Sequence, residues 1–506
     1  MTNFKTILLA VLAVILSSCC KSGDYEFERL YENLPFEMER VYGPQIPDYS
    51  VNLTDFGAVG DGVTLNSEAF AKAMSHLESK GGGHLIVPAG IWLTGPITIL
   101  SNIDLHVTPN AIILFDPSRE LYPVIETVFE GLDTKRCISP VNAYRAKNIS
   151  ITGGGVIDGA GQDWRPLKKS KVTEGFWQKQ VAAGGVVENN IWYPDEGYLE
   201  GTRGASMNVP REGLDLDYIK SFLRPVMVSL RECENVLLED CLFQNSPAWN
   251  LHPLMCRNVI IKNVSVRNPS YSQNGDGIDV ESCENVIIVD SDFDCGDDGI
   301  CIKSGKDADG RRRARPCSKL IIDGCTVYHG HGGFVVGSEM SGGVHDIKVS
   351  NCRFLGTDVG LRFKSNRGRG GVVDGIWIEN INMTNIVTEC ILFNLYYSGA
   401  SPADRVVDGK LVKGADLPLP VDETTPAFRD IHISKVVCNG ARQAMLFKGL
   451  PEMPVKGIDV KDCTITADKG IELSWCEDIS ITGTSIVCPE GVQTLTTHNV
   501  NNLNNQ

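Results

Sequence analysis

Three aspartates, one histidine and two cations stand in four short motifs near the middle of the sequence. These motifs are Asn274-Gly275-Asp276, Gly296-Asp297-Asp298, Gly330-His331-Gly332 and Arg362-Phe363-Lys364. Carboxyl groups crowded into a dry site repel one another when all are ionised, so one of them is expected to keep its proton. An acid beside a base is the pair that hydrolysis of a glycosidic bond requires.

A purely structural interpretation is also open. Aspartate is common at turns, where its carboxylate caps backbone N–H groups. For Asp276 or Asp298 alone this is the simpler interpretation. The combination with His331 and a cationic pair favours chemistry, because Arg362 suits bidentate carboxylate binding and Lys364 supplies a point charge.

The motifs fall on successive copies of a short repeat, with apolar or small residues 3, 5, 8 and 10 positions after an anchor residue. This spacing is mostly of period two and predicts short strands separated by Asn, Asp and Gly turns. Propeller blades would need hairpin-joined strands, and Asn-Gly hairpin sequences are missing at the required spacing. One coil of a parallel β-helix per copy is therefore the prediction. The ten anchors are Ala146, Cys233, Cys256, Cys283, Cys317, Val344, Val373, Phe428, Val455 and Cys476.

Equal offsets within the repeat place the chemical groups in line. Asp297 and His331 each follow their anchor by 14 residues. They should therefore stack on neighbouring coils, about 4.8 Å apart. Asp276 falls on the coil before, and Arg362 and Lys364 fall on the coil after, two residues apart and so facing the same way.

The sequence around the repeats predicts a single all-β domain over residues 51–494. Asn66 or Ser67 is expected to cap a short amphipathic helix that closes the open end of the β-helix. Long gaps between copies predict loop insertions at 157–232 and 396–427. Residues 19–50 are expected to form an N-terminal linker, and 495–506 a frayed polar tail.

The first residues look like a targeting segment. Lys5 precedes an apolar run, Ile7 to Leu16, which is too short to span a membrane as a mature helix. Leu16-Ser17-Ser18-Cys19 resembles a bacterial lipobox, which implies a signal peptide over 1–18 and a lipid on Cys19. An ordinary signal peptide with incidental cysteines is the alternative. Either predicts export, and the lipid anchor predicts a cell-envelope protein of the periplasm or outer membrane.

The chain has 17 cysteines. An exported protein can form disulfides. However, five cysteines share the anchor position and four share position 8 of the repeat. Equivalent positions in stacked coils favour buried thiols that act as small hydrophobic groups over a disulfide framework.

The formal net charge of −16 opposes binding of polyanions such as nucleic acid. Basic residues nevertheless concentrate in one stretch, which favours an anionic ligand there. For Arg311 to Arg315 a solvated basic loop is an equal alternative. The stretch contains Lys303, Lys306, Arg311, Arg312, Arg313, Arg315, Arg362, Lys364, Arg367 and Arg369.

The four motifs resemble those of glycoside hydrolase family 28, the polygalacturonases, in order, in residue type and in the 21-residue step from Asp276 to Asp297. The resemblance spans roughly residues 55–486. It implies a right-handed parallel β-helix that inverts configuration and uses no metal or cofactor. Asp297 resembles the family's general acid, Asp276 and Asp298 resemble the pair that activates water, and His331 resembles the histidine that adjusts protonation.

Substrate contacts are carried over in the same way. Arg362 and Lys364 resemble the residues that hold the galacturonate carboxylate, and Asn274 belongs to the same site. Tyr396 and Tyr397 are both candidates for a family tyrosine, with Tyr397 as our prediction. Two departures from the family pattern are Gly275, where many members have Thr, and Phe363, where many have Ile.

The loop from Ser304 to Pro316 and the 157–232 insertion resemble those of bacterial exo-acting members. The prediction is a monomeric inverting hydrolase that cleaves α-1,4-galacturonic acid linkages of pectin from the chain end. Alternatives are a hydrolase of rhamnogalacturonan or xylogalacturonan, a calcium-dependent pectate lyase, in which His331 has no role, and a non-catalytic β-helical adhesin.

Overall fold

The computed structural model describes residues 26–205, 209–397, 405–407, 410–412 and 417–506. The chain divides into two compact units, Met1–Glu37 and Met38–Gln506. The first contributes α2 (Glu28–Tyr31) to the described residues. No helix within the described ranges is long and apolar enough to cross a bilayer. The predicted signal peptide and Cys19 lie outside the described residues.

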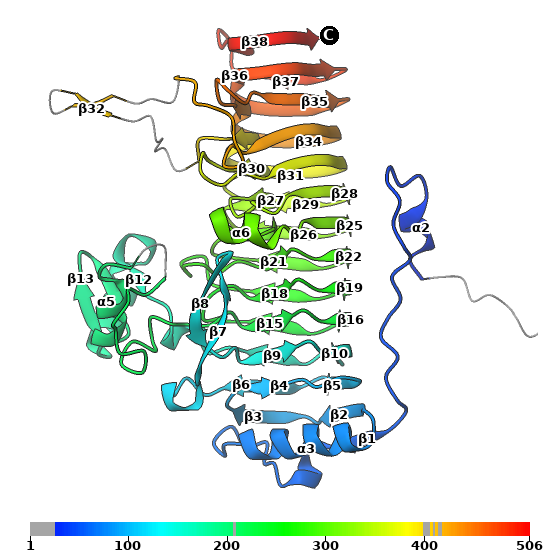
Figure 1. Cartoon of the computed structure of the whole chain (residues 1–506), viewed down its shortest axis with the longest axis vertical. Helices are drawn as coiled ribbons and strands as arrows, with labels where there is room; N and C mark the ends of the chain where they lie inside the picture. The colour runs from blue at the N-terminus through cyan, green and yellow to red at the C-terminus, as the bar shows by residue number, and fades with distance from the viewer. Residues whose placement is uncertain (1–25, 206–208, 398–404, 408–409, 413–416) are drawn as a thin grey trace, which may run out of the picture. The chain divides into compact units, whose positions relative to one another are not determined.

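The second unit is a parallel β-helix whose short strands stack in three ladders (Figure 1). The first ladder contains β1 (Ser50–Asn52), β2 (Gly83–Val87), β5 (Ile103–Val107), β10 (Lys147–Thr152), β16 (Glu234–Glu239), β19 (Arg257–Lys262), β22 (Glu284–Val289), β25 (Cys317–Asp323), β28 (Val344–Ser350) and β35 (Val455–Lys461). The second contains β3 (Gly90–Thr94), β6 (Ala111–Phe115), β11 (Val156–Asp158), β17 (Leu242–Gln244), β20 (Ser265–Arg267), β23 (Asp292–Asp294), β26 (Thr326–His329), β29 (Arg353–Leu355) and β37 (Ser485–Val487).

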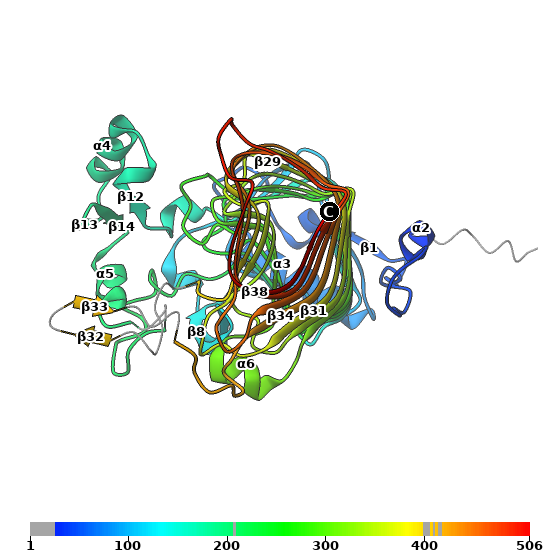
Figure 2. The ribbon, with the colours of Figure 1, turned by 90° about the horizontal axis from the view of Figure 1, so that it is seen from above.

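The third ladder carries the chemistry. It contains β4 (Ile97–Thr98), β9 (Val141–Tyr144), β15 (Val228–Arg231), β18 (Leu251–Leu254), β21 (Ile278–Glu281), β24 (Asp298–Lys303), β27 (Gly332–Gly337) and β30 (Leu361–Lys364). Longer strands bend through more than one ladder in the later coils, and Figure 2 shows the coils along their axis. These are β31 (Val372–Asn394), β34 (Ala427–Lys448), β36 (Thr464–Thr482) and β38 (Leu495–Asn505).

The register confirms the predicted repeat. Lys147, Glu234, Arg257 and Glu284, each one residue after an anchor, pair in succession across the first ladder. The residue two positions after every anchor has a positive φ, between 52° and 63°. Only Gly, and to a lesser degree Asn and Asp, adopt this conformation readily, which explains why those types dominate the position; Lys319 is the exception.

The hydrophobic core fills the inside of the coils. Every cysteine that the structure describes is a free thiol, and all but Cys488 are buried. The prediction of buried thiols in place of disulfides is confirmed for these residues. Phe363 also points into this core, where its ring stacks on Phe393 at 4.4 Å and 6°.

The expected capping helix is α3 (Ser67–Ser79), which follows Asn66 and buries Phe70, Met74 and Leu77. The expected frayed tail is wrong, because residues 495–505 form β38, paired with β36 from Ile471↔Leu495 onward. Backbone hydrogen bonds hold a strand in a ladder whatever its side chains, so polar composition did not reveal it. The 3-10 helices are η1 (Leu53–Phe56), η2 (Arg119–Leu121), η3 (Gly161–Asp163) and η4 (Lys169–Lys171).

Segments that leave the coils form smaller elements. The 157–232 insertion builds a three-stranded sheet with two helices, and residues in 396–427 form a hairpin. The insertion contains β12 (Leu167–Lys168), α4 (Glu174–Ala182), β13 (Val186–Glu188), β14 (Ile191–Tyr193) and α5 (Glu196–Thr202), and the hairpin contains β32 (Arg405–Val407) and β33 (Lys410–Val412).

A second hairpin was not predicted. β7 (Val124–Phe129) and β8 (Leu132–Cys137) are antiparallel and joined by Glu130-Gly131. Both turn residues have positive φ, 49° and 75°. This is the requirement of a type I′ turn, here met without the usual Asn-Gly pair.

Candidate active site

The three aspartates come together at the ends of neighbouring strands. Asp276 precedes β21, Asp297 and Asp298 lie at the start of β24, and His331 precedes β27. One carboxylate oxygen from each aspartate lies within 4.8 Å of the others. His331 stacks on Asp297 as predicted, with Nδ1 3.1 Å from the carboxylate and the backbone N–H donating to the Asp297 carbonyl at 2.8 Å.

Asp298 is buried and bound by both predicted cations. Lys364 Nζ donates to Oδ2 at 2.6 Å, and Arg362 donates to Oδ1 at 3.1 Å. Burial alone would raise the pKa of Asp298, but the charges of Lys364 and Arg362 hold it well below its ordinary value. Asp298 is therefore ionised at every working pH.

The surroundings of Asp276 favour its protonated form. Its side chain is buried, and Oδ1 has no hydrogen-bond partner among the described residues. Burial, followed by the charges of Asp279 and Asp297, raises the pKa of Asp276 well above its ordinary value. The pKa values of Asp276 and Asp298 are thus shifted in opposite directions.

Asp297 is the most exposed of the three aspartates. Its side chain is 24% exposed, whereas Asp276 and Asp298 are buried. Burial would raise the pKa of Asp297, but the hydrogen bond with His331 and the charges of His331 and Lys364 together lower it. The same hydrogen bond raises the pKa of His331. These shifts favour a proton on Asp276 over one on Asp297.

Asn274 is held from two sides. Its Oδ1 accepts a hydrogen bond from Arg224 at 2.6 Å, and its Nδ2 donates to Glu130 at 3.3 Å. Arg224 is itself buried and donates to the Pro247 carbonyl at 2.8 Å. Arg224 and Glu130 were not singled out from the sequence, because both lie far from the motif along the chain.

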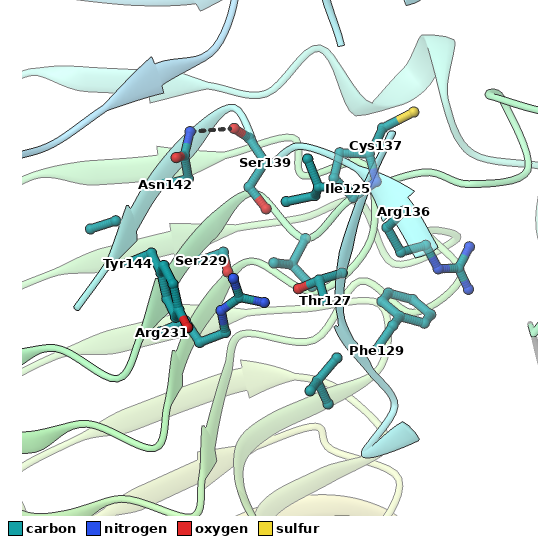
Figure 3. A pocket seen from close by; sticks show the side chains of 14 residues that line it. Ile125, Thr127, Phe129, Arg136, Cys137, Ser139, Asn142, Tyr144, Ser229 and Arg231 are labelled. Atoms are coloured by element: carbon teal, nitrogen blue, oxygen red, sulfur yellow. Dashed lines mark hydrogen bonds between the residues drawn. The ribbon is translucent and has the colours of Figure 1, made fainter. Parts of the chain in front are cut away.

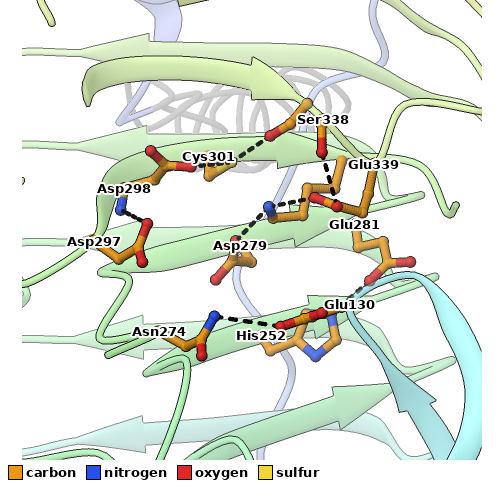
Figure 4. A network of polar contacts seen from close by, with 12 residues as sticks. Glu130, His252, Asn274, Asp279, Glu281, Asp297, Asp298, Cys301, Ser338 and Glu339 are labelled. Atoms are coloured by element: carbon orange, nitrogen blue, oxygen red, sulfur yellow. Dashed lines mark hydrogen bonds and ion pairs between the residues drawn. The ribbon is translucent and has the colours of Figure 1, made fainter. Parts of the chain in front are cut away.

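A buried ionic network continues from the aspartates (Figure 4). Lys303 Nζ lies 3.0 Å from Glu339 and 3.5 Å from Asp279. Neither oxygen of Asp279 has a hydrogen-bond partner among the described residues. Asp279 follows Asp276 by three residues, and this short spacing could have identified Asp279 as a candidate site residue from the sequence. His252 Nε2 lies 2.9 Å from Glu281, and both side chains are buried, which is a structural contact.

The basic stretch is not a free anion-binding patch. Arg312 and Arg313 bind Asp133, and Arg369 binds Asp307. Other members bind carboxylates or backbone carbonyls: Lys303, Lys306, Arg311, Arg315 and Arg367. The prediction of an anionic ligand there is wrong for these residues, because acidic and carbonyl groups distant in sequence already occupy the cations.

The ion pairs of Asp133 with Arg312 and Arg313 hold the β7–β8 hairpin against α6 (Asp307–Arg313), the helix of the Ser304–Pro316 loop. The Lys306 backbone N–H donates to the Gly131 carbonyl at 3.1 Å, and Asp133 N–H donates to Asp309 at 3.0 Å. A Cβ at Gly131 would lie 2.7 Å from the Lys306 nitrogen, so this contact requires glycine. The hairpin tip therefore lies beside Asn274, which Glu130 contacts.

Both departures from the family pattern have a structural reason. A Cβ at Gly275 would lie 1.9 Å from the Ser272 hydroxyl, so Thr does not fit there. Phe363 belongs to the core stack and leaves the reacting face unchanged. Tyr397 is 41% exposed, with its ring centroid 5.1 Å from Lys364 Nζ, which favours it over Tyr396 as the ring beside the cations.

A cation could be held by the three aspartates, whose oxygens are close enough together. Asp298 already faces two cations and Asp297 faces His331, so little unbalanced negative charge is left to attract a metal ion. A small cavity of about 40 Å³ lies under the hairpin, lined by residues such as Thr127, Tyr144 and Arg231 (Figure 3). None of the aspartates lines it.

Fold and site together define a β-helical protein with a carboxylate-based acid–base centre. Residues 220–416 match the model of "Glycosyl hydrolases family 28". Over 488 residues the chain is 28% identical to a "Probable polygalacturonase" of Vitis vinifera, covering 94% of this chain and 85% of that protein. It is 29% identical to an "Exo-poly-alpha-D-galacturonosidase" of Dickeya chrysanthemi, covering 69% of this chain and 57% of that protein.

Among solved structures, the hyperthermoactive exopolygalacturonase of Thermotoga maritima is 34% identical, with a TM-score of 0.72, covering 88% of this chain and 94% of that one. The chain belongs to glycosyl hydrolases family 28. The fold and enzyme class predicted from its motifs are thereby confirmed.

Proposed function

We propose that the protein is an exo-acting polygalacturonase that removes galacturonic acid from the ends of pectic chains. The observation that carries exo action is the hairpin tip beside Asn274. Glu130 accepts a hydrogen bond from Asn274, and the Gly131 carbonyl accepts one from the Lys306 backbone, so segments far apart in the sequence meet next to Asn274. We infer that the hairpin blocks one end of the substrate-binding face, so that a chain end binds there and a continuing polymer does not.

The roles of the residues follow from exposure and charge. Asp297 is the aspartate that a leaving oxygen reaches, so it delivers the proton. Asp276 and Asp298 orient the attacking water. The carboxylate oxygens lie within 4.8 Å of one another, so a proton on Asp276 is close enough to pass to Asp297. His331 holds Asp297 in place, and Tyr397, Arg362 and Lys364 face the substrate.

The test is the product profile on polygalacturonate over time, with Asp297→Asn alongside. Galacturonic acid alone from the earliest samples, absent with the variant, supports the proposal. Mixed oligomers from the start would keep the hydrolase and contradict exo action. Inactivity of the unmodified protein on this polymer, with activity on rhamnogalacturonan or xylogalacturonan, would move the substrate to another pectic linkage.

We also propose that the protein is exported as a monomeric lipoprotein anchored through Cys19. The lipobox-like sequence before Cys19 supports this. Labelling of cells with radioactive palmitate should mark the protein, and Cys19→Ala should abolish the label. A labelled Cys19→Ala variant would contradict the proposal.

A further inference from the structure

Two aromatic rings form an open pocket on the insertion that leaves the β-helix after β11. Phe176 of α4 and Tyr271 have ring centroids 5.3 Å apart. Phe176 is 39% exposed, and Tyr271 is half-buried. The cavity has a volume of about 430 Å³ and is lined by Ser170, Lys171, Val172, Thr173, Phe176 and Tyr271. A second cavity of about 30 Å³ shares both rings.

Tyr271 connects the pocket to the turns that carry the aspartates. Tyr271 precedes Ser272, whose hydroxyl donates to the Pro269 carbonyl at 2.6 Å. A Cβ added at Gly275 or Gly296 would lie 1.9 Å or 2.3 Å from that hydroxyl, so Ser272 is wedged between the two turns that carry the aspartates. The position of the Tyr271 ring is therefore fixed relative to the active site.

Lys171 lines the pocket, and further exposed lysines lie close to Phe176 in the sequence. Lys168, Lys171 and Lys179 are exposed, and none forms an ion pair with any residue in the described part of the chain. The neighbouring Lys169 binds Glu174 at 3.2 Å. On a protein of net charge −16 this local excess of unpaired cations attracts an acidic ligand. It contrasts with the paired cations beside the aspartates.

We propose that Phe176, Tyr271 and Lys171 form a second binding site for a galacturonan chain, outside the catalytic site. Aromatic rings offer flat apolar faces to the C–H faces of a pyranose, and a lysine ammonium is a point charge for the uronate carboxylate. The site would hold a distant part of the polymer whose end is being cleaved. This inference rests on the proposed function.

Binding tests the site separately from turnover. In an Asp297→Asn background, Lys171→Glu and Phe176→Ala should each weaken the affinity for polygalacturonate by roughly threefold to tenfold, the range of one exposed ionic or aromatic contact. Lys80→Ala, which removes an exposed lysine at the end of α3, is the matched control and should bind normally. Equal affinity for all four proteins overturns the proposal.

Kinetics give a second readout. The Michaelis constant for polygalacturonate should rise severalfold in Lys171→Glu and Phe176→Ala, while that for digalacturonate rises much less, because a dimer is too short to occupy both sites. Equal rises for polymer and dimer would place the rings in the catalytic site and contradict a second one. If the unmodified enzyme fails on both substrates, it is the proposed function that fails.

Discussion

Lys364 Nζ lies 2.6 Å from Asp298 Oδ2, so a cation expected to hold substrate already binds a carboxylate of the candidate site. Its charge, with that of Arg362, keeps Asp298 ionised although it is buried. A substrate carboxylate that approaches this pair shares the cations with Asp298. Binding of an anionic substrate at these cations and the pKa of Asp298 are therefore coupled.

Removal of that ammonium should cost both stability and activity. Lys364→Met leaves a buried carboxylate with one partner fewer, a change worth about 3–5 kcal/mol. The pKa of Asp298 should rise, so the acidic limb of the pH–rate profile should move to higher pH. Differential scanning calorimetry and pH–rate profiles measure the two effects. Lys456→Met, which removes an exposed partner of Glu477, is the control and should change neither.

Asp276 should make the fold less stable as the pH rises. Its pKa is raised in the folded state, so above about pH 4, where the unfolded chain releases this proton, the folded chain still binds it. Unfolding then releases protons, and stability falls with increasing pH up to the raised pKa. Asp276→Asn should flatten this decline while abolishing activity. A melting temperature measured from pH 4 to 8 that declines equally in both proteins would refute the protonated Asp276.

The hairpin contact should control the product pattern. Gly131→Val places a side chain against the Lys306 nitrogen and should push the hairpin tip away from Asn274. Longer oligogalacturonides should then appear beside the monomer in chromatograms of early digests. Gly491→Val is matched for backbone strain, with φ 81° against 75°, and meets no neighbour within 4 Å. It should leave the products unchanged, and a monomer-only pattern from both variants would refute the role of the hairpin.

The stereochemical outcome is a sharper test of the mechanism. Carboxylates within 4.8 Å resemble the roughly 5–5.5 Å spacing of retaining glycosidases more than the wider spacing of inverting ones. Family resemblance predicts inversion, and two aspartates beside the acid provide for an attacking water. We expect β-galacturonic acid as the first product in proton NMR spectra of fresh digests. An initial α-anomer would make one aspartate a nucleophile.

Parts of the site could be predicted because the repeat fixes them. Asp297 and His331 share an offset from their anchors, and neighbouring coils pair in register, so their contact follows from counting. The same reasoning recovered Arg362 and Lys364. The repeat did not reveal the first two coils or β38, because its apolar pattern is incomplete there.

Contacts between distant segments could not be predicted. Arg312 binds Asp133 across 179 residues, and nothing in the local sequence of either predicts the other. The turn Glu130-Gly131 lacks the usual hairpin sequence. The basic stretch was therefore interpreted as a ligand site when its charges serve mainly to fasten loops.

The buried cysteine thiols of the β-helix should react very slowly with alkylating reagents while the protein is folded. Burial raises the pKa of Cys241, Cys317 and Cys476 to about 12. At pH 8 only on the order of one thiol in ten thousand is then the reactive thiolate. Iodoacetamide should leave these three thiols unlabelled in the native protein and modify them once the coils open. These cysteines therefore report unfolding. The number of alkylated thiols, counted by mass spectrometry over time, would measure how often the coils separate.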